Sequence, residues 1–191
     1  MGVFDLPEGY SEIKRVDFLK NKKLALFINA GALVIMAAMF FLGIFFVPLS
    51  FTVDAGQLVP LLLKAAGGLL AIVLYLIAHE WVHGIFIKKF SGKKAKYGFV
   101  GLYAYAGTDA YLNKRHYIVV ALAPVVLFGV AFLALNLFSP RAWFWGVYLL
   151  QIMNLSGAVG DLYITWLMSR LPADVLTNDE GVAMVIYSKT K

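Results

Sequence analysis

The sequence predicts an all-α membrane protein with four transmembrane helices and a short β-like or re-entrant segment between the second and the third. Of the 191 residues, 61% are hydrophobic and only 15% are charged, and the mean hydropathy is +0.79. Four apolar runs are each long enough to cross a bilayer core of ~30 Å. Basic residues flank these runs instead of interrupting them. At this length a single domain, residues 1–191, is the expected organisation.

The first part of the chain combines a polar start with two predicted spans. In order, the elements are an interfacial helix (8–18), a first span (24–47), a loop (49–64) and a second span (65–87). Pro48 ends the first span because proline cannot continue a helix. Lys88 and Lys89 end the second span, since lysine belongs at the headgroup level.

The second part begins with the one long internal loop. The elements are the loop (90–116) with its β-like stretch (97–108), a third span (117–138), a fourth span (142–168), and a polar tail (170–191) with one short strand (181–187). The stretch 97–108 is rich in glycine and aromatic residues and shows no helical period, which favours strand-like backbone. Pro124 in the third span is expected to free one main-chain carbonyl and to kink the helix.

The charge distribution indicates lipid contact and an orientation. The net charge is +6 and the pI is near 9.4, but the basic residues border apolar runs, so anionic lipid headgroups explain them better than nucleic acid does. They gather at the amino end and in the loop 88–116. By the positive-inside rule we expect a multi-pass protein of the cell membrane with both termini cytoplasmic. The absence of cysteine excludes disulfides and cysteine-liganded zinc.

A His-Glu-x-x-His motif lies inside the second predicted span. His79 and His83 are four residues apart, so on a helix they share one face and can offer two imidazole nitrogens to one divalent metal. Glu80 follows His79 directly and is placed to take the proton of an activated water. Such side chains are costly inside a bilayer, so we expect them to face the bundle interior and to mark function.

A catalytic zinc usually has three protein ligands and one open position, so the two histidines need a partner. Asp161 is the one other acidic residue within a predicted span. His79 precedes Lys88 by nine residues and Asp161 precedes Arg170 by nine, which places both about 13.5 Å inside the cytoplasmic ends of their helices. His83 lies about 7.5 Å inside. We therefore expect His79, His83 and Asp161 to bind Zn²⁺ at one level in the membrane.

Other polar and small residues of the spans carry weaker indications. Asn154, Gly157 and Asp161 share one helical face, and two interpretations of Asn154 stay open: a donor to a substrate carbonyl or oxyanion near the metal, or an interhelical hydrogen bond. Gly157 is expected to let two helices approach. His116 is interpreted as an interfacial histidine, and Tyr75 as a packing or aromatic-belt residue.

These motifs resemble those of the site-2 protease class of intramembrane zinc metalloproteases. The resemblance rests on His79-Glu80-x-x-His83 in an early span, Asn154-x6-Asp161 in a later one, and Ala121-Leu122-Ala123-Pro124 in the third. The short length, the four spans and the Leu6-Pro7 opening are more similar to the zincin peptidase family of small prokaryotic membrane proteins. The resemblance implies that His79, His83 and Asp161 are zinc ligands and that Glu80 is the catalytic acid/base.

The function expected from this resemblance is zinc-dependent cleavage of a peptide bond in or at the membrane, with a membrane protein or peptide as substrate. The β-like stretch 97–108 is expected to pair with an extended substrate. The alternative is a non-proteolytic metal-binding membrane scaffold, sensor or accessory protein, because the 191 residues hold no PDZ-type domain for admitting substrates. The sequence gives no indication of the oligomeric state.

Overall fold

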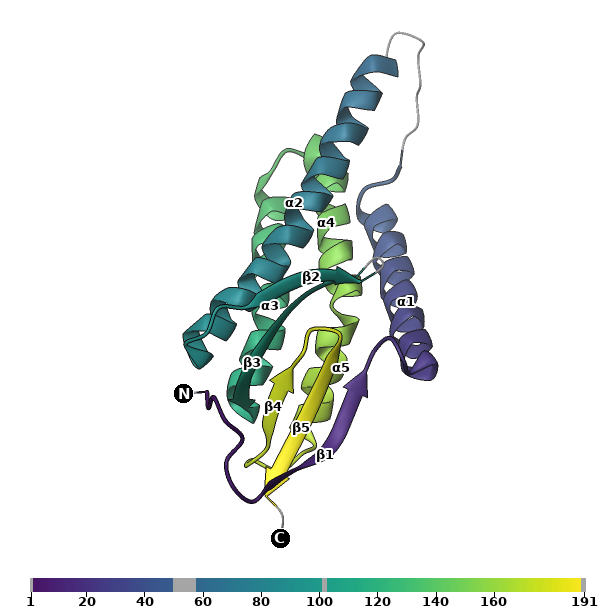
Figure 1. The fold of residues 1–191 in the computed structure, drawn as a ribbon. Coiled ribbons are helices and arrows are strands. Elements are labelled where there is room, and N and C mark those ends of the chain that lie inside the picture. Colours follow the sequence, from purple (N-terminus) through teal and green to yellow (C-terminus); the bar gives the residue numbers. More distant parts are fainter. Residues whose placement is uncertain (1, 50–57, 101–102, 190–191) are drawn as a thin grey trace.

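A bundle of long apolar helices carries an antiparallel sheet at one end (Figure 1). The structure is a computed structural model, and it describes residues 2–49, 58–100 and 103–189. The helices are α1 (Lys22–Phe46), α2 (Leu58–Ser91), α3 (Lys114–Phe138), the short 3-10 helix η2 (Arg141–Trp143), α4 (Phe144–Gly157) and α5 (Val159–Ser169). Among the described residues, four stretches are long and apolar enough to span a membrane: 22–46, 58–91, 114–138 and 141–169.

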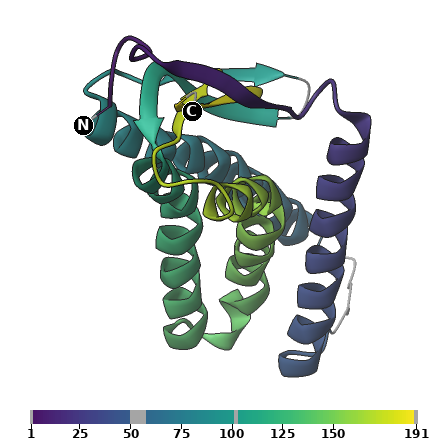
Figure 2. The ribbon, with the colours of Figure 1, turned by 90° about the horizontal axis from the view of Figure 1, so that it is seen from below.

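The sheet has five strands, and every pair of neighbours is antiparallel. The strands are β1 (Tyr10–Asp17), β2 (Lys96–Val100), β3 (Tyr103–Asn113), β4 (Leu176–Asp179) and β5 (Ala183–Lys189). Their order is β1-β5-β4-β3-β2, so strands from both ends of the chain and from the long internal loop form one layer. Seen from below, this layer lies across the ends of the helices (Figure 2).

The sheet corrects the all-α class that the sequence predicts. The strand-like character of residues 97–108 is confirmed by β2 and β3, with residues 101–102 outside the described chain. The interfacial helix expected over residues 8–18 is wrong, because β1 pairs there with β5. The tail contributes two strands where one was expected, and residues 58–64 belong to α2 and not to a loop.

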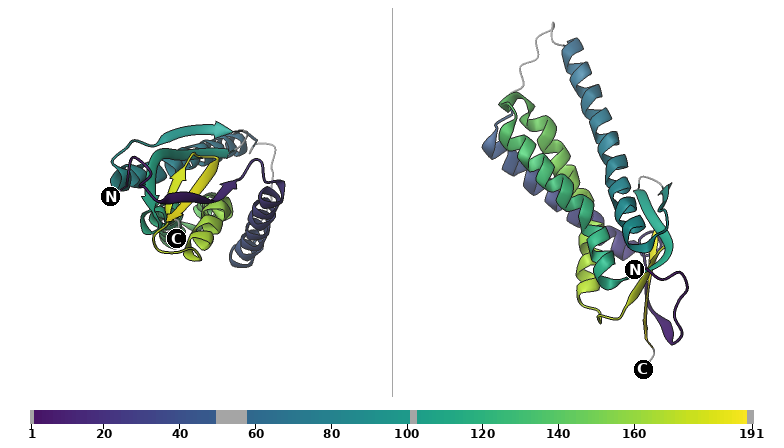
Figure 3. Two further views of the ribbon diagram at one scale, coloured as in Figure 1. Left: turned by 60° about the horizontal axis from the view of Figure 1, so that its bottom comes forward. Right: turned by 90° about the vertical axis from the view of Figure 1, so that its left-hand side faces the viewer.

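Helix α2 diverges from the other helices with distance from the sheet. In the right-hand view of Figure 3, α2 stands apart from α1, α3 and α4 at the end away from the sheet and comes together with them near the sheet. The carboxyl-terminal part of α2 packs on α3 and on β3, while most side chains of its amino-terminal part are exposed. The contacts between α2 and the other helices therefore lie toward the sheet.

The main core lies where the sheet meets the helix ends. Its buried members come from the sheet and from α2, α3 and α5, together with the α5–β4 connection: Val16, Ile87, Leu112, Tyr117, Val120, Ile164, Leu167, Met168, Val175, Met184 and Ile186. Burying a side chain of this size contributes about 1.5–3 kcal/mol. Side chains from distant parts of the chain therefore fix the sheet against the very helix segments that carry the His-Glu-x-x-His motif and Asp161.

Two helix boundaries follow from local chemistry. Asn113 caps α3, since its side chain accepts a hydrogen bond from the main-chain nitrogen of His116 at 2.9 Å. The fourth apolar stretch is broken at Ala158, whose dihedral angles of φ −81° and ψ 8° separate α4 from α5. The break places Asp161 in the first turn of a new helix, where the helix dipole favours a negative charge.

The turn between β4 and β5 yields a test of the sheet's packing. Gly181 has φ +93°, and a Cβ at this position would overlap the ring of Tyr105. We expect Gly181→Ala to lower the thermal unfolding midpoint of the purified protein, because it combines backbone strain of about 1–3 kcal/mol with overpacking of similar size. Gly92→Ala is the matched control: Gly92 has φ +78° but open space around it, so only the backbone cost applies. Equal midpoints for the two variants would contradict this packing.

Candidate metal centre

The two histidines of the motif lie side by side on the buried face of α2. His79 and His83 are each 8% exposed, and their ring centroids are 4.9 Å apart. This face packs on α3, whereas the neighbouring Trp81 points outward and is 61% exposed. Glu80 is half-buried beside the histidines, and one candidate ligand atom of each of these three side chains lies within 4.8 Å of the others.

Asp161 joins this group from α5. Its Oδ2 lies 3.6 Å from Nε2 of His79, and its Oδ1 lies 3.7 Å from Nε2 of His83. One carboxylate thus faces both rings, each through a different oxygen. The structure brings together the three side chains that were expected at one level in the membrane. They come from α2 and α5, and His83 and Asp161 are 78 residues apart in the chain (161 − 83).

The spacing and chemistry of these donors suit zinc. Two atoms that each lie about 2.1 Å from a shared tetrahedral zinc are roughly 3.4 Å apart, close to the separations between Asp161 and the two rings. The other ring nitrogens are already engaged: Nδ1 of His79 lies 3.1 Å from the hydroxyl of Tyr75, and Nδ1 of His83 lies 2.9 Å from the carbonyl of Val120. The Nε2 atoms therefore remain for a metal.

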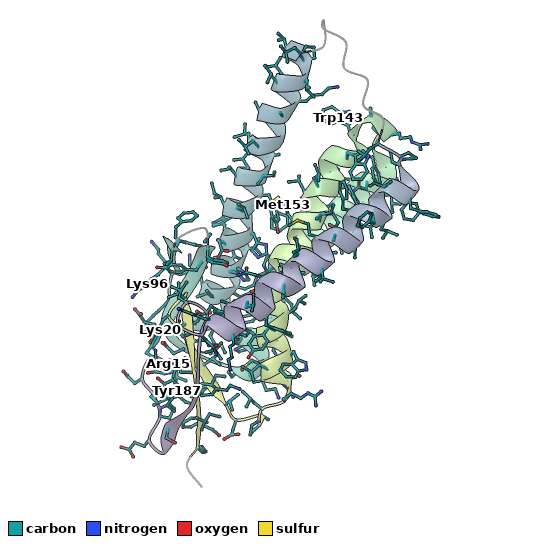
Figure 4. All side chains as sticks on the ribbon, turned by 90° about the vertical axis from the view of Figure 1, so that its right-hand side faces the viewer. Arg15, Lys20, Lys96, Trp143, Met153 and Tyr187 are labelled. Atoms are coloured by element: carbon teal, nitrogen blue, oxygen red, sulfur yellow. The ribbon has the colours of Figure 1, made fainter. Side chains whose placement is uncertain are left out.

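A cavity of about 460 Å³ opens in front of these side chains. It lies in the space where α2 meets the other helices, and Figure 4 shows Met153, one of its lining residues, in the angle between α2 and α4. His79, Glu80, His83 and Asp161 lie together on its wall. The remaining lining comes from α1, β3, α3, α4 and the β4–β5 hairpin and is mostly apolar. Such a cavity can admit a segment of peptide chain and bring it to the polar wall.

Asn154 follows one of the two interpretations left open by the sequence, and Gly157 differs from its expected role. Asn154 is fully buried; its Oδ1 accepts a hydrogen bond from Tyr75 at 3.1 Å, and its Nδ2 donates to the carbonyl of Val125 at 3.0 Å. With both polar groups engaged between helices and the residue absent from the cavity wall, Asn154 is an interhelical hydrogen-bonding residue here and not an oxyanion donor. Gly157 faces the cavity, and nothing lies within 4 Å of the place a Cβ would take, so it is not a packing glycine.

Two further polar residues at the site are missed by the sequence analysis. Tyr75 lies one turn before His79, and its spacing on the same helical face was a signal that could have linked it to the motif. Asp179 lies in the polar tail, and no local pattern connects it with the spans. It lines the cavity from β4, where its Oδ2 accepts a hydrogen bond from Tyr117 at 2.5 Å and its Oδ1 accepts one from the main-chain nitrogen of Gly181 at 2.8 Å.

The surroundings of Asp179 change its acidity. Withdrawal from water raises the pKa of Asp179 from 3.8 to about 6, although the hydrogen bonds from Tyr117 and Gly181 act in the opposite direction. Between pH 3.8 and about 6 the unfolded chain has lost this proton while the folded chain still holds it. The free energy of unfolding therefore falls as the pH rises through this range and levels off above it.

We expect Asp179→Asn to remove this part of the pH dependence. Thermal unfolding midpoints of the purified parent, measured from pH 4 to pH 7, should fall more steeply up to about pH 6 than those of the variant. Asp109→Asn is the control: a hydrogen bond from Lys96 lowers the pKa of this exposed carboxyl, so its effect lies at more acidic pH and has the opposite sign. Parallel curves for the parent and Asp179→Asn would show that this carboxyl does not titrate as stated.

Comparison with known proteins connects this geometry with a family. A 24.7 kDa protein of Pyrococcus woesei, described only as uncharacterized, is 34% identical over an alignment of 122 residues that covers 60% of this chain. The chain spans about half of that relative, 52% of its length, and no solved structure matches. The model of a family described as "Putative zincin peptidase" matches residues 72–176, a range that contains His79, Glu80, His83 and Asp161. Because this match covers more than half of the chain, the protein belongs to that zincin peptidase family, whose cofactor is zinc.

Proposed function

We propose that this protein is a zinc-dependent peptidase that cleaves peptide bonds within or at the edge of a membrane. The observation that supports it most is the meeting of Asp161 with the Nε2 atoms of His79 and His83 at the wall of a peptide-sized cavity. In this proposal His79, His83 and Asp161 hold the zinc. Glu80 is within reach of the same centre, but we assign the third ligand to Asp161, because its two oxygens each face one ring.

Glu80 acts as the general base in this proposal. A zinc ion bound at the centre would polarise the scissile carbonyl and make the attacking water more acidic. Glu80 lies beside His79 on the cavity wall, is half-buried and keeps its carboxylate free of any ion pair among the described residues. It can therefore take the proton of the water and pass it to the nitrogen of the leaving amine.

The cavity offers an edge to which an extended substrate can bind. Residues 103–106 of β3 pair with β2 on one side, but β4 pairs only with Thr108 and residues 111–113. In the described part of the chain no strand covers the other edge of residues 103–106, and these four residues line the cavity. A substrate added there as a strand would be unwound before cleavage. Across the cavity, Gly157 and Gly160 leave open the space that side chains would fill.

The arrangement of charged and apolar residues supports membrane embedding with the sheet in the cytoplasm. Apolar side chains such as Phe45 and Phe138 are at least 80% exposed on the helices. In Figure 4, Arg15, Lys20 and Lys96 lie at the sheet end and Trp143 at the opposite end. This distribution fits the positive-inside rule.

Cysteine labelling tests this orientation directly, because the chain contains no cysteine. In intact cells, a membrane-impermeant maleimide should label Trp143→Cys and should reach Lys94→Cys only after the membrane is opened. Labelling of Lys94→Cys in intact cells would contradict the proposed orientation and favour the opposite one.

Two variants separate the proposed peptidase from the alternative of a non-proteolytic metal-binding scaffold. Glu80→Gln should keep zinc and lower cleavage of a membrane-spanning peptide about 10²- to 10⁴-fold, because only the base is lost. Asp161→Ala should lose zinc on dialysis, because one of three ligands is removed. Zinc content and cleavage by purified protein are the measurements, with Asp109→Ala, an exposed carboxylate paired with Lys96, as control.

The outcomes assign each role independently. Parent-like cleavage by Glu80→Gln would remove Glu80 as the base, and parent-like zinc content in Asp161→Ala would remove Asp161 as a ligand. A zinc-loaded parent that cleaves no membrane-spanning peptide would favour the scaffold.

The Glu80→Gln variant also tests the proposed substrate-binding edge, because it should bind the peptide without cleaving it. We expect hydrogen exchange at the main-chain amides of residues 103–106 to slow when the peptide is added.

A further inference from the structure

Hydrogen bonds connect Nδ1 of each motif histidine to the main chain of α3. Nδ1 of His83 lies 2.9 Å from the carbonyl oxygen of Val120. Nδ1 of His79 reaches α3 indirectly, through the hydroxyl of Tyr75 and the amide of Asn154 to the carbonyl oxygen of Val125. Each chain of hydrogen bonds therefore ends at an atom that can only accept a proton. This fixes the direction of every bond along it.

For His79 the direction follows link by link. The carbonyl of Val125 accepts, so the Asn154 atom facing it is Nδ2 and the atom facing Tyr75 is Oδ1. Because Oδ1 cannot donate, the hydroxyl of Tyr75 gives its proton to Asn154. The same hydroxyl oxygen must then accept from His79, so Nδ1 of His79 carries the hydrogen and Nε2 keeps its lone pair.

For His83 a main-chain carbonyl fixes the tautomer directly, with no side chain between it and the ring. Pro124 has no N–H, so the carbonyl of Val120, four residues earlier in α3, has no helical partner. The Nδ1–H of His83 supplies one, and Nε2 again keeps its lone pair. The carbonyl that Pro124 was expected to free thus has a use at the metal centre.

We propose that Tyr75 and Asn154 are positioning residues that hold His79 in the Nδ1–H tautomer, with the lone pair of Nε2 directed at the zinc. The inference rests on the proposed zinc centre and extends it to two residues that are not ligands of the metal. The two histidines differ in this respect: His79 depends on two side chains, whereas His83 depends on the backbone. Substitutions can therefore loosen one ligand and leave the other unchanged.

The zinc-free protein allows the tautomers to be read directly. Labelling histidine with ¹⁵N and recording the imidazole nitrogens at a pH where the rings are neutral distinguishes Nδ1–H from Nε2–H. The chain has three histidines, and the third is an internal contrast. The Oδ1 of Asn113 accepts from the main-chain nitrogen of His116, so its Nδ2 faces Nδ1 of His116 at 3.1 Å and donates to it. We expect Nε2–H at His116 and Nδ1–H at His79 and His83, with signals assigned by single His→Gln variants.

Tyr75→Phe is the main test, and Tyr148→Phe is its matched control. Tyr75→Phe removes one hydroxyl and keeps the ring that packs on Phe128 and Phe132. It should release His79 from the Nδ1–H tautomer and weaken zinc binding about 10- to 100-fold in a chelator competition, while His83 keeps its tautomer. The hydroxyl of Tyr148 also serves a buried ring, but it donates to the carbonyl of Met39 away from the centre, so its loss should change neither measurement.

Three results would overturn the inference. The first is an Nε2–H tautomer at His79 in the parent. The second is a Tyr75→Phe variant with the same His79 tautomer and the same zinc affinity as the parent. The third is a Tyr75→Phe variant that binds zinc more weakly but keeps the His79 tautomer, which would mean that Tyr75 acts through packing alone. Asn154→Leu should have the same effect as Tyr75→Phe on the tautomer of His79 and on zinc affinity. If Asn154→Leu does not fold, the result for Tyr75→Phe alone is the test. Neither measurement depends on proteolysis, so a protein that shows the tautomers but cleaves nothing would contradict the proposed function only.

Discussion

A histidine ring buried among apolar helices needs a partner for each of its nitrogens, because an unpaired polar atom in such a place costs about 1–3 kcal/mol. This requirement shapes the centre of the molecule. The Nδ1–H groups of His79 and His83 are engaged on the side of α3. Their Nε2 lone pairs face the two oxygens of Asp161, which are acceptors too, so the partner that both sides need is a cation between them. The packing of α2 on α3 and the position of α5 therefore depend on the same few polar contacts that would serve a metal.

The sequence was informative where the signal is local or chemically rare. The four apolar stretches are visible in hydropathy alone, and the spacing of His79 and His83 by one helical turn needs no knowledge of the fold. Asp161 could be found because few acidic residues lie within apolar runs, and because its depth matches that of His79. The break at Ala158 was not predicted, because residues 142–168 were expected to form one continuous span.

The sequence could not show which distant segments pair as strands. β1 carries charges and has only Val16 fully buried, so its pattern gives little sign of a strand; it is a strand because β5, at the other end of the chain, pairs with it. Asp179 reaches the cavity for the same reason, through the pairing of β4 with β3. The role of Asn154 depended on which way its amide faces, and only the arrangement of α3 and α4 determines that.

The region shared with the zincin family ends at residue 176, at the first residue of β4. It holds every side chain proposed to bind zinc, yet Asp179, Gly181 and Val182, which close one side of the cavity, come after it, and the wall from α1 comes before it. The zinc-binding side chains and the edge of residues 103–106 thus lie within the shared region, whereas two parts of the cavity wall lie outside it. If the proposed peptidase activity holds, relatives that differ only in these two outer parts would bind the same ion in a cavity of different shape.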